Sequence, residues 1–100
     1  MSRIQGTTTK HTVTRYFYFV SQARSESTPQ AQPPRNINIA DREVELPPGP
    51  YVLHWECLGN PGTELAFTVL AGAVELAKVS QKIAPGDTSA WGRQNLEVPA

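Results

Sequence analysis

Apolar and polar residues alternate along much of the chain with the period of two that is typical of β-strands. The alternation is clearest over residues 51–57, where the odd-numbered positions form one apolar face: Tyr51, Leu53, Trp55 and Cys57. The even-numbered positions form the opposite face: Val52, His54 and Glu56. Successive side chains of a strand point to opposite sides of its sheet, so we expect one of these two faces in the core.

Further strands are predicted by the same alternation or by runs of β-branched and aromatic residues. They cover residues 12–21, 36–40, 43–46, 64–70, 74–83 and the region around Leu96 and Val98, which gives six to eight strands in total.

Helix competes with strand over residues 63–82, which are rich in Ala, Leu and Glu. The pair Ala71-Gly72 interrupts this segment, and the residues ahead of the pair alternate. Two strands are therefore predicted, with a helix over residues 74–82 as the alternative.

Pro-Gly occurs three times, at residues 48–49, 61–62 and 85–86. Proline presets the φ angle of the second residue of a type II turn, and glycine accepts the positive φ of the third. Type II turns twist against the strands of a tight hairpin, so we expect corners that pass the chain between two sheets, or wider loops. Short strands joined in this way predict a small antiparallel two-sheet β-sandwich, immunoglobulin-like or jelly-roll-like, with a small β-barrel as the alternative.

One domain, residues 1–100, is predicted from the length of the chain. Residues 1–10 are polar apart from Met1 and Ile4, and we expect a flexible N-terminus there. Residues 22–35 contain no large apolar residue and are rich in Ser, Gln and Pro. Because such a segment cannot offset its ordering entropy by burial, a mobile surface loop is predicted.

The segment 16–20 is apolar on both faces of its expected strand. We expect Phe17 and Phe19 to point into the core, which directs Tyr16, Tyr18 and Val20 outward. Such an outward stripe is explained by packing against neighbouring side chains, by an oligomer interface or by a platform on which a ligand stacks. Because an uncharged aromatic edge invites aggregation, the strand is predicted to be central in its sheet or paired with another chain.

Composition narrows the function classes. Nine Lys and Arg residues balance nine Asp and Glu residues, which argues against nucleic acid and a polybasic membrane surface as partners. The single cysteine excludes an internal disulfide. No apolar segment follows a basic start as in a signal peptide, so a cytoplasmic protein is expected, although export without a signal would leave no trace. No cofactor is expected.

Reactive chemistry has few candidate residues. His54 and Cys57 lie three apart on one expected strand and therefore on opposite faces, which argues against a catalytic pair, and no catalytic residue is predicted. His54 and Glu56 share a face, and His11 could join them in an open metal site. Solvated side chains are the favoured interpretation, so no metal site is predicted.

We expect a non-enzymatic recognition or assembly module that acts through a surface of the sandwich and self-associates or binds another protein. The alternative is a lectin-like, carbohydrate-binding domain with a glycan ligand, and a metal-dependent enzyme is the third class. Trp91 follows a turn-rich segment, and a loop anchor that plugs the end of the sandwich is favoured over an exposed sugar-stacking ring. The candidate ligand or interface residues are Tyr16, Tyr18, His54, Glu56, Trp91, Arg93 and Asn95.

Overall fold

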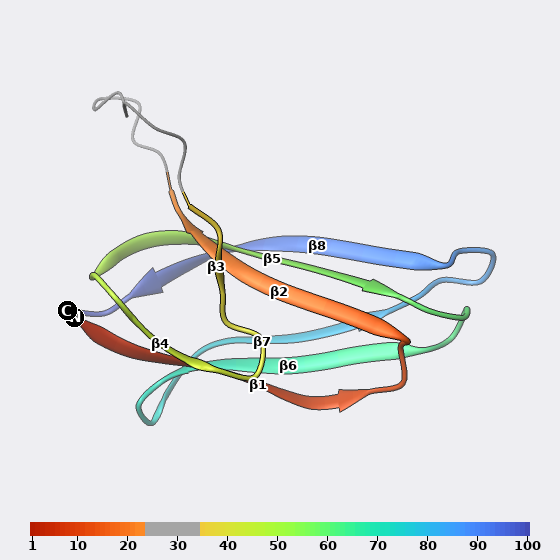
Figure 1. Cartoon of the computed structure of the whole chain (residues 1–100), viewed down its shortest axis with the longest axis horizontal. Helices are drawn as coiled ribbons and strands as arrows, with labels where there is room; N and C mark the ends of the chain where they lie inside the picture. The colour runs from red at the N-terminus through yellow and green to blue at the C-terminus, as the bar shows by residue number, and fades with distance from the viewer. Residues whose placement is uncertain (24–34) are drawn as a thin grey trace.

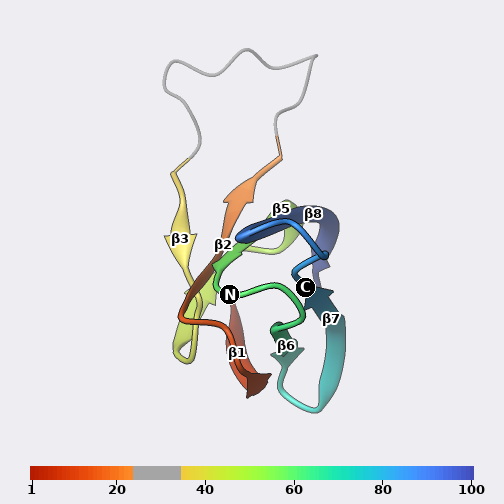
Figure 2. The ribbon, with the colours of Figure 1, turned by 90° about the vertical axis from the view of Figure 1, so that its right-hand side faces the viewer.

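Eight strands form two antiparallel four-stranded sheets that pack face to face (Figures 1 and 2). The structure is a computed structural model that describes residues 1–23 and 35–100. Sheet A has the order β4 (Glu43–Leu46), β1 (Ser2–His11), β6 (Glu64–Ala71) and β7 (Val74–Lys82). Sheet B has the order β3 (Ile37–Asn38), β2 (Arg15–Gln22), β5 (Gly49–Leu58) and β8 (Ser89–Val98). The predicted all-β sandwich is confirmed.

The three Pro-Gly corners pass the chain from one sheet to the other, as expected. They join β4 to β5, β5 to β6 and β7 to β8, and each of these pairs has one strand in either sheet. Gly62 and Gly86 adopt φ angles of 86° and 90°, close to the value that the third residue of a type II turn requires. The Pro-Gly pairs therefore mark three of the points at which the chain changes layer, and the connections from β1 to β2 and from β3 to β4 change layer without one.

The segment 63–82 is a β-hairpin, so the alternative of a helix over residues 74–82 is wrong. Gly72 takes a φ of 61° in the tight turn between β6 and β7, a conformation that favours glycine. The pairing changes register between Val69 and Leu70, which accommodates one extra residue on β7.

The N-terminal prediction is wrong. Residues 2–11 are not a flexible terminus but form β1, which lies between β4 and β6 inside sheet A. Ile4 is fully buried, and the β-branched threonines that follow it suit a strand that is half exposed. The predicted mobile loop of residues 22–35 lies, for residues 24–34, outside the described residues.

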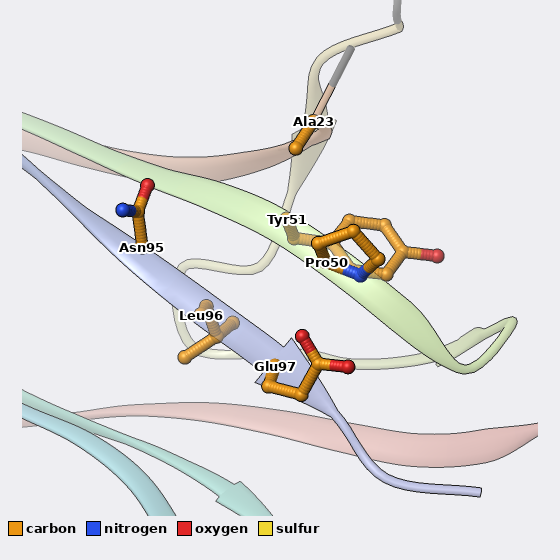
Figure 3. A pocket seen from close by; sticks show the side chains of 6 residues that line it. All are labelled: Ala23, Pro50, Tyr51, Asn95, Leu96 and Glu97. Carbon is orange, nitrogen blue, oxygen red and sulfur yellow. The ribbon is translucent and has the colours of Figure 1, made fainter. Parts of the chain in front are cut away.

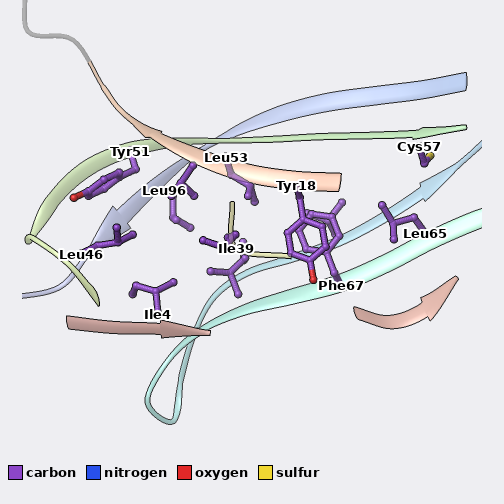
Figure 4. Packing of buried hydrophobic residues seen from close by; sticks show 14 of the residues in the cluster. Ile4, Tyr18, Ile39, Leu46, Tyr51, Leu53, Cys57, Leu65, Phe67 and Leu96 are labelled. Carbon is purple, nitrogen blue, oxygen red and sulfur yellow. The ribbon is translucent and has the colours of Figure 1, made fainter. Parts of the chain in front are cut away.

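Strand β2 has the opposite orientation to the one expected. Tyr18 and Val20 are fully buried between the sheets, whereas Phe17 points outward and is 45% exposed. The ring of Tyr18 stacks on Phe67 of β6 with centroids 3.8 Å apart (Figure 4). The Tyr18 hydroxyl forms a 2.9 Å hydrogen bond with that of Thr8 on β1. A buried tyrosine is stable because its polar end is hydrogen-bonded in this way. The expectation that β2 is central holds, since it lies between β3 and β5.

The core fills the space between the sheets with alternating side chains from both layers (Figure 4). The odd-numbered face of β5 is the one that points inward, with Tyr51, Leu53 and Cys57 buried. The described residues include no buried charged or polar residue, so apolar burial and stacking dominate the packing.

Gly6 permits the closest backbone approach in the core. A Cβ atom at this position would lie 2.0 Å from the carbonyl oxygen of Ile39 and 2.9 Å from the ring of Tyr18. The backbone N–H of Gly6 also donates to the carbonyl of Arg42, at 3.1 Å. The crossover from β3 to β4 therefore packs directly on the backbone of β1.

We expect Gly6→Ala to lower the free energy of unfolding by about 1–3 kcal/mol, because the backbone atoms around the new methyl group cannot move without breaking this contact. Urea denaturation followed by circular dichroism measures the change. Thr7→Ala is the control on the exposed face of the same strand, with an expected change of within about 0.5 kcal/mol. Equal stability of Gly6→Ala and the wild type would contradict the close approach.

Candidate functional site

The outer faces of the two sheets differ in chemistry. Sheet A presents mainly charged and small polar side chains, among them Arg3, Gln5, Thr7, Glu43, Glu45, Thr68, Lys78 and Ser80. Ion pairs join neighbouring strands of this sheet. Arg3 Nε lies 3.4 Å from Oε1 of Glu43, and Lys10 Nζ lies 2.5 Å from Oε1 of Glu64. A solvated outer face of this kind is usual for an antiparallel sheet.

Sheet B presents aromatic rings on its outer face. Strand register places Phe17, Glu56 and Trp91 in one row across the sheet and Phe19, His54 and Arg93 in the next. We call these six residues the aromatic face. Leu58, 38% exposed, lies one row further along the same side of the sheet. Several exposed apolar side chains gathered on one sheet are typical of an interaction surface.

The rings of β2 and β5 stack on one another. Phe17 and Phe19 are nearly parallel, with centroids 6.2 Å apart, and Phe19 stacks on His54 at 5.1 Å. Phe19 and His54 are half-buried in this arrangement. Phe19 thus packs between Phe17 and His54 on the surface of the sheet. The apolar surface exposed to solvent belongs mainly to Phe17 and Trp91.

Trp91 lies in strand β8 and is 68% exposed, so the interpretation as a loop anchor is wrong. Its pairing with Glu56 directs it to the outer face. The tryptophan that anchors the interior is Trp55, whose indole N–H donates to Oε1 of Gln81 on β7 at 3.0 Å. Gly92 makes room for that ring, since a Cβ atom there would lie 2.3 Å from the Trp55 ring.

The two tyrosines of the predicted site lie away from the aromatic face. Tyr18 is fully buried, and the hydroxyl of Tyr16 donates to Oδ2 of Asp41 at 2.5 Å. His54, Glu56, Trp91 and Arg93 do share the outer face of sheet B, and Asn95 occupies the next outward position on β8. Sequence reasoning missed Phe17 and Phe19. The signal that could have found them is the run of threonines over residues 7–9, because a hydroxyl there can form a hydrogen bond with an inward tyrosine, as Thr8 does with Tyr18.

Two shallow hollows border the aromatic face. One lies at the open end of β2 and is lined by Arg15, Tyr16, Phe17, Glu56 and Leu58. The other lies between β5 and the end of β8 and is lined by Ala23, Pro50, Tyr51, Asn95, Leu96 and Glu97 (Figure 3). Neither hollow collects a nucleophile with a base.

The residues considered for reactive chemistry are separated. Cys57 is fully buried, and burial raises the pKa of its thiol, while His54 lies on the opposite face of the same strand. The ring of His11 contacts Tyr16, with centroids 5.0 Å apart, whereas His54 stacks on Phe19. Within residues 1–23 and 35–100, no three His, Cys, Asp or Glu side chains are grouped to hold a metal ion.

A scan against protein-family models and searches against curated proteins and solved structures found no match. In the described part of the chain, none of the secondary structure is a helix long and apolar enough to cross a membrane.

Asp41 connects the crossover between β3 and β4 to β1 of sheet A and β2 of sheet B. It has a positive φ of 56°, its Oδ1 accepts the backbone N–H of Thr8 at 2.8 Å, and its Oδ2 accepts the Tyr16 hydroxyl. Partial burial by itself raises the pKa of Asp41, but these hydrogen bonds stabilise the carboxylate and hold its pKa below the usual value. The same bond to Asp41 raises the pKa of Tyr16.

This pKa direction predicts a stability change at acid pH. Because the pKa of Asp41 is lower in the folded than in the unfolded chain, its contribution is present above about pH 3.9 and is lost as the pH falls through the folded value. We expect Asp41→Asn to destabilise the protein by about 1 kcal/mol at neutral pH, because two hydrogen bonds to an exposed carboxylate are weakened. Urea denaturation between pH 7 and pH 2.5 measures this.

The loss of stability on acidification should be smaller in Asp41→Asn than in the wild type. Asp87→Asn, in the exposed corner between β7 and β8, is the control and should follow the wild-type pH dependence. A pH dependence that is identical in all three proteins would contradict the role given to Asp41.

Proposed function

We propose that the protein is a non-enzymatic recognition and assembly module that self-associates through sheet B. The observation that supports this most is the distribution of exposed large apolar side chains in the described chain: Phe17, Leu58 and Trp91 all lie on sheet B, whereas Met1 and Val74 are at a chain end and a hairpin turn. Covering such side chains with a second molecule removes apolar area from water, which favours association.

Trp91 is the principal contact residue in this proposal. Its ring is the most exposed aromatic side chain, and Glu56 and Arg93 lie beside it on neighbouring outward positions. Tryptophan and arginine are the residues that most often dominate the energy of protein interfaces, where a large ring is desolvated and charges lie at the rim. The buried thiol of Cys57 and the separation of His11 from His54 support a role without catalysis.

Trp91→Thr tests the proposal. We expect the wild type to have a mass well above 11.0 kDa in light scattering at high protein concentration, because copies associate. The substitution should raise the dissociation constant by about tenfold or more, because removing the side chain of a principal contact residue typically costs about 2 kcal/mol of binding free energy.

Val74→Thr is the matched control, because Val74 is an exposed apolar residue on sheet A. It should leave the association unchanged. A wild type that remains an 11.0 kDa monomer at millimolar concentration would refute self-association.

Carbohydrate binding is the second candidate. It is supported by Trp91 together with Arg93 and Asn95, which alternate along the outward side of β8 and offer a free ring beside hydrogen-bonding groups. Phe19 is a poorer platform for a sugar, since its ring is stacked on His54.

Tryptophan fluorescence separates this candidate from self-association. A carbohydrate ligand should shift or quench the emission of the wild type in a saturable titration, and Trp91→Phe should lose this response because Trp55 is half-buried on the inner side. Titration with monosaccharides and a glycan array provide the measurement. No response to any sugar, with association intact, would remove the lectin alternative.

A further inference from the structure

Strand β8 is a long edge strand of sheet B, and β7 of sheet A comes close to part of it. It has ten residues, contains no proline and pairs with β5 on one side, and no described strand pairs with its other side in sheet B. Edge strands are ordinarily shortened, interrupted by proline or covered, because their free backbone groups are a template for another strand. Strand β3, the opposite edge of the same sheet, is only two residues long.

The free backbone groups of β8 belong to its odd-numbered residues. Backbone N–H groups of Ala23 and Thr14 donate to the carbonyls of Pro50 and Leu58. The backbone N–H and C=O groups of the even-numbered residues of β5 therefore point toward β2. The backbone groups of the odd-numbered residues of β5 consequently point toward β8, where the register pairs Leu53 with Gln94. It follows that the N–H and C=O groups of the alternate residues Trp91, Arg93, Asn95 and Glu97 point to the open edge.

The side chains of β8 favour one antiparallel pairing of this edge with itself. Arg93, Asn95 and Glu97 are exposed and lie on the outer face, with Asn95 midway between the two charges along the strand. Figure 3 shows Asn95 and Glu97 on β8. If two copies meet with Asn95 opposite Asn95, each Arg93 lies opposite Glu97 of the second copy. Opposite charges at directly facing positions stabilise a strand pair. Pairing centred on Arg93 would instead place two guanidinium groups opposite one another.

We propose that two copies of the chain pair antiparallel along β8, with Asn95 on the two-fold axis and two Arg93–Glu97 contacts between the copies. This arrangement rests on the proposed self-association and specifies its geometry. Sheet B becomes one continuous eight-stranded sheet, in which the aromatic faces of both copies lie on the same side. A hydrogen bond from Ser2 Oγ to the carbonyl of Pro99, at 2.6 Å, holds the end of β8 against β1. Trp91 lies beside the last residues of the second copy, and Phe17 remains open.

Charge exchange tests this geometry. Arg93→Glu alone and Glu97→Arg alone each replace both attractive contacts by repulsive ones, and each should weaken the dimer by about tenfold or more in sedimentation velocity. The double variant R93E/E97R restores both contacts and should form the dimer as the wild type does. An equimolar mixture of the two single variants should also form the dimer, because a chain that is acidic at both positions then pairs with a chain that is basic at both.

Three further variants test the geometry without changing any charge. Asn95→Cys in a Cys57→Ala background should form a disulfide-linked dimer on mild oxidation, because directly paired Cα atoms lie about 5.5 Å apart, within disulfide reach. Thr68→Cys on the outer face of sheet A, in the same background, is the matched control and should remain monomeric on a non-reducing gel. Phe17→Thr should leave the β8 dimer unchanged.

The outcomes separate the two proposals. A dimer that resists charge exchange, is weakened by Phe17→Thr and gives no link through Asn95→Cys would overturn the β8 pairing and leave self-association standing through a face-to-face contact. A wild type without any dimer would overturn the proposed function together with the pairing.

Discussion

The stacking of Tyr18 on Phe67 is the contact on which the arrangement of both sheets depends. It joins β2 of sheet B to β6 of sheet A with ring centroids 3.8 Å apart, and the hydrogen bond between the hydroxyls of Tyr18 and Thr8 connects β1 to the same contact. Because side chains alternate along a strand, an inward Tyr18 makes Phe17 and Phe19 point outward. A shift of β2 by one residue would reverse this and bury two phenylalanines in place of a tyrosine and a valine.

The inward tyrosine thus creates the asymmetry between the two outer faces. Sheet A is covered by charged and polar side chains that pair with one another, as Arg3 does with Glu43. Sheet B carries the aromatic face and ends in the open strand β8, where Trp91 is 68% exposed. Sheet A also ends in a long edge strand, β7, but the exposed large apolar side chains within the strands lie mainly on sheet B, beside the edge strand β8. This coincidence underlies the proposal that sheet B is where copies of the chain meet.

The sequence predicted the strands of this fold well where the alternation was strict and poorly where two faces were equally apolar. Residues 51–57 alternate, and one of their two faces lies in the core as expected. Residues 16–20 are apolar on both sides, so hydrophobicity alone could not predict which side faces the core. The hydroxyl of Thr8, which forms the hydrogen bond that favours an inward Tyr18, lies on another strand. The polar segment 1–10 predicts a flexible end, because the burial of this strand comes mainly from Ile4 and Gly6 and a glycine gives no hydrophobic signal.

The most direct test of this account is a nuclear Overhauser experiment on the aromatic rings of the protein in solution. With Tyr18 stacked on Phe67, strong cross-peaks are expected between the ring protons of these two residues, and none between Phe17 and Phe67. Cross-peaks from Phe17 to Phe67, with Tyr18 in contact with solvent instead, would contradict the orientation of β2 and remove the aromatic face with it.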